Sequence, residues 1–336
     1  MRILLNRETS ESVNFEIMLV DREAAASVKK SVFLEGKDMS QKQEQEHIIS
    51  GNTPALPDPL SVIVLGSGGP AAAGRASSGY LVLVDGEARF LVDAGSGIFT
   101  RLGEAQINIS RLDTVFLTHL HIDHAAELPS LFKARAMVSQ EAIHFSVYGP
   151  LGKGVYPSTS QFVHLLFDAG GAFAYQKSFQ TTETISVMDL PIDLTAPVRE
   201  IYVRDNVVVQ AIATRHGDTP ANAYRINYQG ASVVFSGDVD PSSLPNLTQL
   251  AQGANLFICT CDVLDPPGSP APLYALHTPP QQIGALAAAA GVRFLLLSHL
   301  SPPIARAQDQ VRQSIRRAYK GEVQFATDLM HVQARL

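Results

Sequence analysis

The stretch Thr118-His119-Leu120-His121-Ile122-Asp123-His124 places three imidazoles and a carboxylate within six positions, directly after the apolar run 115–117. Imidazole nitrogens and carboxylate oxygens are ligands that zinc prefers, at distances of about 2.0 to 2.2 Å. Alternate residues of an extended segment face the same side, so His119 and His121 can bind one metal ion, while Asp123 and His124 lie beyond the turn and can face a second. Because the chain has only 10 His in 336 residues, chance explains this density poorly. The stretch therefore predicts metal-dependent hydrolysis.

Length and composition are typical of a folded α/β protein. Of the residues, 46% are hydrophobic and 17% are charged, and the length suits one large domain with an appendage, or two domains. The net charge of -6 gives no overall basic face, so we expect no extended nucleic-acid surface, although local basic patches remain compatible with it. No run of about 18 apolar residues occurs and no signal-peptide core is evident, so we expect no membrane partner. Cys259 and Cys261 lie too close for an unstrained disulfide, which favours a reducing compartment and a cytoplasmic protein.

The chain divides by composition near residue 58. Residues 1–58 carry polar and charged runs and end in a Pro-punctuated linker, which predicts a flexible N-terminal extension. Met39 would be a plausible start of the native chain. We expect residues 59–336 to form the catalytic domain. Its segment 149–198 has Gly and Pro breaks, and we expect it to form a lid or a substrate wall.

Apolar runs predict two groups of strands. The first group covers residues 61–65, 80–84, 89–92 and 114–117, with the turn Asp85-Gly86 joining a hairpin, and the second covers 206–213, 223–228 and 232–235. Helices are expected over 125–138, around 160–167 and over 281–290. Two strand-rich halves indicate two sheets rather than one.

In the second half of the chain, three further residues whose side chains can bind a metal ion follow apolar strands. His216 follows the strand that ends at Ala213, Asp238 follows 233–237, and His299 follows 294–298. Each alone is better explained as a core or loop residue, but together with the first cluster they indicate a site for two metal ions.

These motifs resemble the metallo-β-lactamase superfamily, and their order is most similar to its ribonuclease Z and arylsulfatase-like branch. The resemblance covers nearly everything from 61 to 299. It implies an α/β protein with a four-layer αββα fold, in which two mixed β-sheets are sandwiched between helices. The residues that carry it are Gly66–Pro70, Gly74–Tyr80, Leu91–Gly95, His119–His124, His216, Ser236–Asp238, His277 and Ser298–His299.

The resemblance also implies the ligand set. His119, His121 and His216 would hold one zinc, Asp123, His124 and His299 would hold the other, and Asp238 would bridge them. Two zinc ions about 3.5 to 4 Å apart can share a hydroxide that attacks the scissile bond, with Mn²⁺ or Fe²⁺ as alternative metals. Asp123 and Asp238 are accordingly expected to take part in catalysis.

His277 opens the sequence His-Thr-Pro-Pro and precedes His299 by 22 residues. In ribonuclease Z-like proteins a similar element lies over the metals, and the resemblance implies a catalytic role for His277 as a proton donor or transition-state contact. The structural alternative is a histidine that makes a local hydrogen bond at a helix start.

One departure from the family concerns the substrate. Ribonuclease Z commonly inserts a long tRNA-binding arm between the positions that match His216 and Asp238, but only 21 residues separate them here. We therefore expect a phosphodiesterase that acts on a small-molecule or short nucleotide ester, and we include a homodimer among the expected assemblies.

Several alternatives stay open. An arylsulfatase-like sulfate-ester hydrolase, a lactonase or β-lactamase-type hydrolase, and a non-catalytic binding module on the same fold all fit the ligand set, whereas a flavo-diiron oxidoreductase would need a flavin domain. The run 66–71 matches a dinucleotide fingerprint, but Pro70 and the glycines after it indicate a loop leading to a strand rather than a helix. Cys259 and Cys261 are best explained as core residues.

Overall fold

The computed structural model describes residues 59–71, 73–139, 141–178 and 184–336. The predicted N-terminal extension, with the alternative start at Met39, lies outside these residues. Among the described residues, none of the helices is long and apolar enough to cross a membrane.

The first sheet has seven strands in the order β14-β1-β2-β3-β4-β5-β6. Strands β14 to β3 are antiparallel to their neighbours, whereas β3 to β6 run parallel. The predicted hairpin is confirmed, because Asp85 and Gly86 both have positive φ, as a tight turn between β2 and β3 requires. The strands are β1 (Leu60–Gly66), β2 (Gly79–Val84), β3 (Glu87–Val92), β4 (Thr114–Phe116), β5 (His144–Pro150), β6 (Thr184–Leu190) and β14 (His331–Gln333).

The second sheet repeats this plan in the order β13-β12-β11-β10-β9-β8-β7. Strands β7 to β10 are antiparallel and β10 to β13 are parallel. Both sheets are therefore mixed, as predicted. The strands are β7 (Arg199–Arg204), β8 (Val207–His216), β9 (Thr219–Tyr228), β10 (Ala231–Phe235), β11 (Leu256–Thr260), β12 (Phe294–Ser298) and β13 (Glu322–Phe325).

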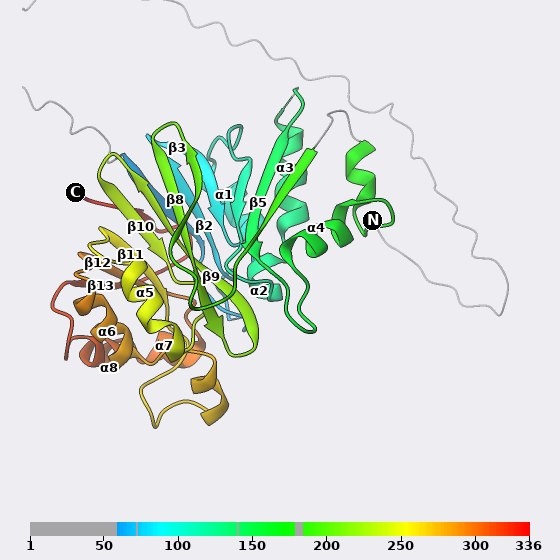
Figure 1. The fold of residues 1–336 in the computed structure, drawn as a ribbon. Coiled ribbons are helices and arrows are strands. Elements are labelled where there is room, and N and C mark those ends of the chain that lie inside the picture. Colours follow the sequence, from blue (N-terminus) through cyan, green and yellow to red (C-terminus); the bar gives the residue numbers. More distant parts are fainter. Residues whose placement is uncertain (1–58, 72, 140, 179–183) are drawn as a thin grey trace, which may run out of the picture. The chain divides into compact units, whose positions relative to one another are not determined.

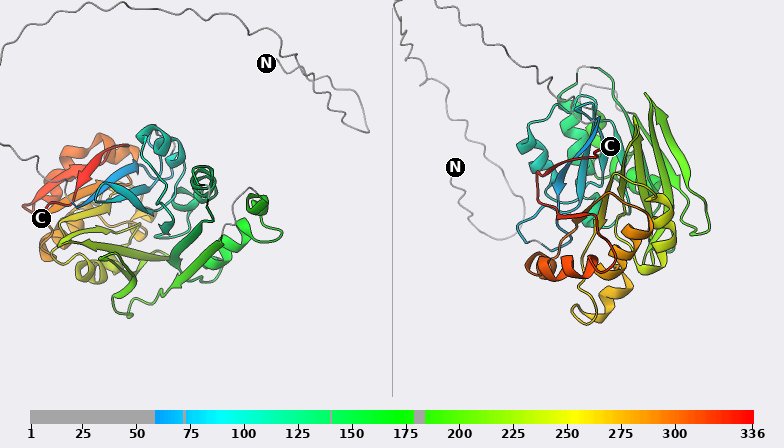
Figure 2. Two further views of the ribbon diagram at one scale, coloured as in Figure 1. Left: turned by 90° about the horizontal axis from the view of Figure 1, so that it is seen from above. Right: turned by 90° about the vertical axis from the view of Figure 1, so that its left-hand side faces the viewer.

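Three apolar cores hold the layers together, and the layers of sheets and helices can be followed in Figures 1 and 2. The inner faces of the two sheets pack on each other, α1, α3 and α4 cover the outer face of the first sheet, and α5, α6 and α8 cover that of the second. The predicted αββα architecture is confirmed. The helices are α1 (Ile98–Ala105), α2 (Ile122–Ala125), α3 (Leu128–Met137), α4 (Thr159–Phe167), α5 (Leu244–Leu250), α6 (Pro280–Ala289), α7 (Pro302–Arg306) and α8 (Gln308–Ile315), with 3-10 turns η1 (Ala174–Ser178), η2 (Pro241–Ser243) and η3 (Ala271–Ala275).

Three sequence predictions need correction. The helix expected over 125–138 is α3, which begins at Leu128, because Pro129 favours the first turn of a helix. The short helix α2 before it was not predicted. His216 is the last residue of β8 rather than part of a following loop. In the segment 149–198, α4 confirms the helix expected around 160–167, whereas the edge strand β6 was not predicted, because Gly and Pro breaks interrupt this segment.

Two other predictions are confirmed. The run 66–71 leads through a loop to β2, not into a helix, which removes the dinucleotide interpretation. Cys259 and Cys261 are free thiols in the core beneath α5 and α6.

Candidate metal centre

Seven predicted ligands come together where strands of both sheets end. The ligand atoms of His119, His121 and His216 lie within 4.8 Å of one another, and so do those of Asp123, His124 and His299. Asp238 groups with His119 and His124 on one side and with His216 and His277 on the other. Asp238 thus occupies a shared position between the two groups.

The loop after β4 places the first four ligands. β4 ends at Phe116, and α2 begins at Ile122 with His121 at its N-cap position. This brings the rings of His119 and His121 to a centroid distance of 4.6 Å. Asp123 and His124, on this short helix, group with His299.

Asp93, at the end of β3, orients this loop. Its carboxylate accepts hydrogen bonds from the backbone N–H of Thr118 (2.7 Å) and the Thr118 hydroxyl (2.9 Å), and it lies 2.8 Å from Nδ1 of His124. When Nδ1–H of His124 donates to Asp93, Nε2 is left to face the cluster. The sequence analysis did not assign Asp93 a role, although its place at the end of an apolar strand was the available signal.

The second half of the chain positions its ligands differently. His216 donates from Nδ1 to the backbone carbonyl of Leu276 at 2.8 Å, which directs Nε2 inward. His299 Nε2 lies 3.2 Å from Asp123 Oδ2 and 3.3 Å from Asp238 Oδ2. His299 therefore connects the two halves of the cluster.

The centre is buried and rich in unpaired ligand atoms. Within the described part of the chain, His119 Nε2, His124 Nε2 and Asp238 Oδ1 are buried without a hydrogen-bond partner. Burial would raise the pKa of Asp238, but the imidazoles of His299 and His124 hold it well below its usual range. Burial also lowers the pKa of His119, which keeps that imidazole neutral. Buried ligand atoms without a partner, a neutral imidazole at His119 and an ionised carboxylate at Asp238 fit a divalent metal.

His277 lies at the side of this cluster, between two carboxylates. Its Nδ1 is 4.0 Å from Asp238 Oδ2, and its Nε2 is 3.5 Å from Asp262 Oδ2. Burial lowers the pKa of His277 to about 4, and burial raises that of Asp262 to about 6. The sequence analysis missed Asp262, because it lies beyond the end of β11 among residues that were explained by the core.

A cavity of about 530 Å³ opens beside Asp123. Its lining includes Arg75, Arg101 and the exposed side chain of Ile122. This cavity brings cationic and apolar groups to the edge of the candidate metal centre.

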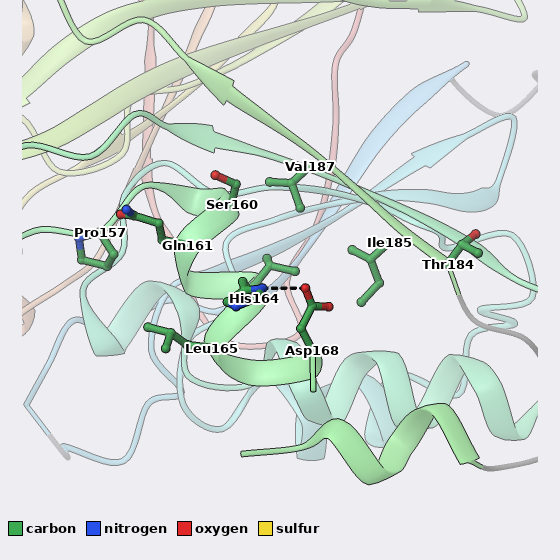
Figure 3. Close-up of a pocket in the computed structure, with 10 residues that line it drawn as sticks. Pro157, Ser160, Gln161, His164, Leu165, Asp168, Thr184, Ile185 and Val187 are labelled. Atoms are coloured by element: carbon green, nitrogen blue, oxygen red, sulfur yellow. Dashed lines mark hydrogen bonds and ion pairs between the residues drawn. The ribbon is translucent and has the colours of Figure 1, made fainter. Parts of the chain in front are cut away.

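A larger cavity, of about 880 Å³, lies between α4 and β6. Figure 3 shows Ile185 and Val187 of β6 on one side and the His164–Asp168 pair of α4 on the other. The His164 Nδ1 and Asp168 Oδ2 atoms are 2.6 Å apart. None of the seven ligands lines this cavity, whereas Asp123 lines the smaller one.

Comparisons with known proteins agree with this geometry. A model of the β-lactamase superfamily domain matches residues 88–300. The chain is 30% identical over 289 residues to ribonuclease Z of Mycobacterium avium (strain 104), covering 82% of this chain and 98% of the relative.

Solved structures show the same fold. The metallo-β-lactamase fold protein YhfI from Bacillus subtilis aligns with a TM-score of 0.61 and 25% identity, covering 82% of this chain and 99% of that one. The short form of human tRNase Z aligns with a TM-score of 0.63 and 22% identity, covering 82% of this chain and 100% of that one.

Proposed function

The chain belongs to the ribonuclease Z family of the β-lactamase superfamily and is a metal-dependent hydrolase of phosphodiester bonds; we propose that its centre holds two zinc ions and that its substrate is a short nucleotide ester. The curated relatives are named ribonuclease Z, which gives no support to the sulfate-ester, lactone or non-catalytic alternatives.

The observation that carries the two-metal proposal is the shared position of Asp238. The two groups of three ligands flank this carboxylate, so one metal would be held by His119, His121 and His216 and the other by Asp123, His124 and His299. The nitrogen-rich donor set favours zinc, with Mn²⁺ and Fe²⁺ as alternatives. When bound, two such metals would lower the pKa of a water molecule and neutralise phosphoryl charge.

The protein groups around the centre would guide protons. Asp123 presents a carboxylate oxygen at the centre and would accept the proton of the attacking water, while Asp238 would hold the two metals in place beside it. His277 lies beside Asp238. Its buried imidazole is neutral near pH 7, and the negative charge of a bound phosphodiester would favour its protonated form, which would donate a proton to the leaving oxygen. Asp262 faces the other nitrogen of His277 and would fix the orientation of that ring.

The surroundings support a short substrate. The 21 residues between His216 and Asp238 are occupied by a tight turn, β9, a second tight turn and β10, which leaves no length for a tRNA-binding arm. Arg75 in the cavity beside Asp123 suits a phosphate, whereas Arg101 there is held by Glu104 and Asp328. The homodimer, the absence of an extended nucleic-acid surface and the role of 149–198 as a lid or substrate wall stay predictions.

A substrate panel tests this proposal. Zinc-replete protein would be assayed with bis-p-nitrophenyl phosphate, an aryl sulfate, an acyl-homoserine lactone and a cephalosporin. We expect the phosphodiester to be cleaved fastest and chelation to abolish its cleavage. Faster turnover of the sulfate or the lactone would contradict the proposed substrate class.

A further inference from the structure

The segment that joins β5 to α4 forms a tight hairpin, residues 151–157, which we call the β5–α4 hairpin. Lys153 and Tyr156 exchange two backbone hydrogen bonds, each of 3.0 Å. Gly154 has φ of 62°, which favours glycine at this turn. Gly152 packs so closely that a Cβ atom there would lie 2.6 Å from the backbone nitrogen of Ser158. The hairpin is therefore held in one shape.

The start of α4 fixes the hairpin from its other side. Ser158 is the N-cap of α4 and forms a reciprocal capping box with Gln161, with hydrogen bonds of 3.0 and 3.2 Å. Because Tyr156 precedes this cap by two residues, its backbone is anchored at both ends. A rigidly held aromatic side chain loses little conformational entropy when it binds a ligand.

The hairpin carries Tyr156 to the candidate metal centre. The Tyr156 ring centroid lies 6.3 Å from that of His121, with 52° between the ring planes, and the side chain is only partly buried. The side chain of Ile122, next to His121, is 74% exposed. Apolar and aromatic groups thus border a centre whose reaction acts on a charged phosphodiester.

The Asp123 side of the centre has a different character. The cavity there is lined by Arg75 and Arg101 as well as Ile122, whereas the hairpin contributes the ring of Tyr156 on the side of His121. A phosphate fits the first environment and a planar, weakly polar ring fits the second. The two environments match the two parts of a nucleotide.

We propose that Tyr156 is a stacking platform for a nucleobase next to the scissile phosphodiester, so that the enzyme selects nucleotide esters whose base is unpaired. This inference rests on the proposed phosphodiesterase function. A base within a duplex is stacked on its neighbours and cannot present its face to Tyr156. Stacking on an aromatic side chain is worth enough to change affinity by about tenfold and depends little on base identity.

The test compares two esters with the same leaving group. Thymidine 5′-(p-nitrophenyl phosphate) carries a base, and methyl p-nitrophenyl phosphate does not. We expect Tyr156→Ala to lower kcat/KM for the thymidine ester about tenfold, mainly through KM, and to leave the methyl ester unchanged. Tyr156→Phe keeps the ring and should restore wild-type behaviour, and Val155→Ala serves as a matched control on the same hairpin.

If Tyr156→Ala lost the same factor of kcat/KM with both esters, Tyr156 would only support His121. If kcat/KM for the thymidine ester were unchanged in Tyr156→Ala, no base would bind at this residue. Either result overturns the inference. The affinity of metal-loaded protein for short single-stranded oligo(U) gives a readout that needs no turnover. There we expect Tyr156→Ala to weaken binding about tenfold, and wild-type affinity in that variant would refute stacking. Failure of the wild-type enzyme to cleave either ester would instead contradict the proposed function.

Discussion

The two halves of the molecule supply the metal centre in different ways. The half built on the first sheet delivers four ligands from one loop and one helical turn, 119–124, and a side chain, Asp93, orients them. The half built on the second sheet delivers single ligands from separate strand ends, and a backbone carbonyl orients His216. Local sequence therefore specifies the first half of the centre, whereas the fold as a whole specifies the second.

The largest effect is expected where the halves meet, at Asp238. Asp238→Ala removes the carboxylate that both ligand groups share, so we expect metal content to fall and phosphodiester turnover to drop about 10³-fold or more. Metal analysis and steady-state kinetics on the same preparation would measure both. Asp309→Ala is the matched control, because Asp309 is exposed on α8 and is absent from the ligand groups. If Asp238→Ala kept its metal and its activity, the shared-ligand interpretation would be wrong.

His277→Ala tests a second-half residue that is not assigned to a metal. We expect turnover to fall about 10²-fold while metal content stays intact, because loss of a positioned proton donor typically costs this much. The loss should be smaller for a p-nitrophenyl ester than for an ester with a poor leaving group. Loss of metal in this variant would instead make His277 a ligand, in keeping with its proximity to His216 and Asp238.

Asp93→Asn tests the support of the first half. An amide retains the size of the carboxylate but loses its charge, so we expect metal affinity or activity to fall about 10- to 100-fold. Competition with a chromogenic chelator would measure the affinity. Asp113→Asn, which changes a carboxylate beside β4 outside the centre, should behave as wild type. Unchanged affinity in Asp93→Asn would show that the loop positions His124 without this partner.

The smallest effect concerns a contact that ties the chain's last segment to the first half. Asp328 accepts hydrogen bonds from Ser67 and from the Ala76 backbone at 2.7 to 3.1 Å, and it pairs with Arg101. Burial would raise its pKa, but these donors lower it below the ordinary value. Asp328→Asn should cost about 1 to 3 kcal/mol of unfolding free energy at pH 7.

The pH dependence of that cost follows from the lowered pKa. Stability from Asp328 is fully present above the unfolded pKa of about 4 and is lost as the pH falls through the folded pKa. Urea unfolding of metal-free protein should therefore show a difference in unfolding free energy between wild type and Asp328→Asn that is large at neutral pH and becomes smaller in acid. If this difference in unfolding free energy did not depend on pH, the carboxylate charge would not be what stabilises the contact.

The contrast between the halves also explains what the sequence could predict. The cluster at 119–124 could be recognised in the sequence because one short segment carries several ligands. His216, Asp238 and His299 could be recognised because apolar strands precede them. Asp262 and Asp93 were missed because their function depends on partners 15 to 31 positions away, which only the folded chain brings near. Strand β6 was missed because it is half exposed and follows a segment broken by glycines.

The most direct test of the central claim is the number of metal ions in the intact protein. Native mass spectrometry of zinc-replete wild type and of Asp238→Ala would count the metals per chain. The two halves joined at Asp238 predict two zinc ions per wild-type chain and fewer in the variant. Full phosphodiesterase activity with a single metal per chain would contradict that account.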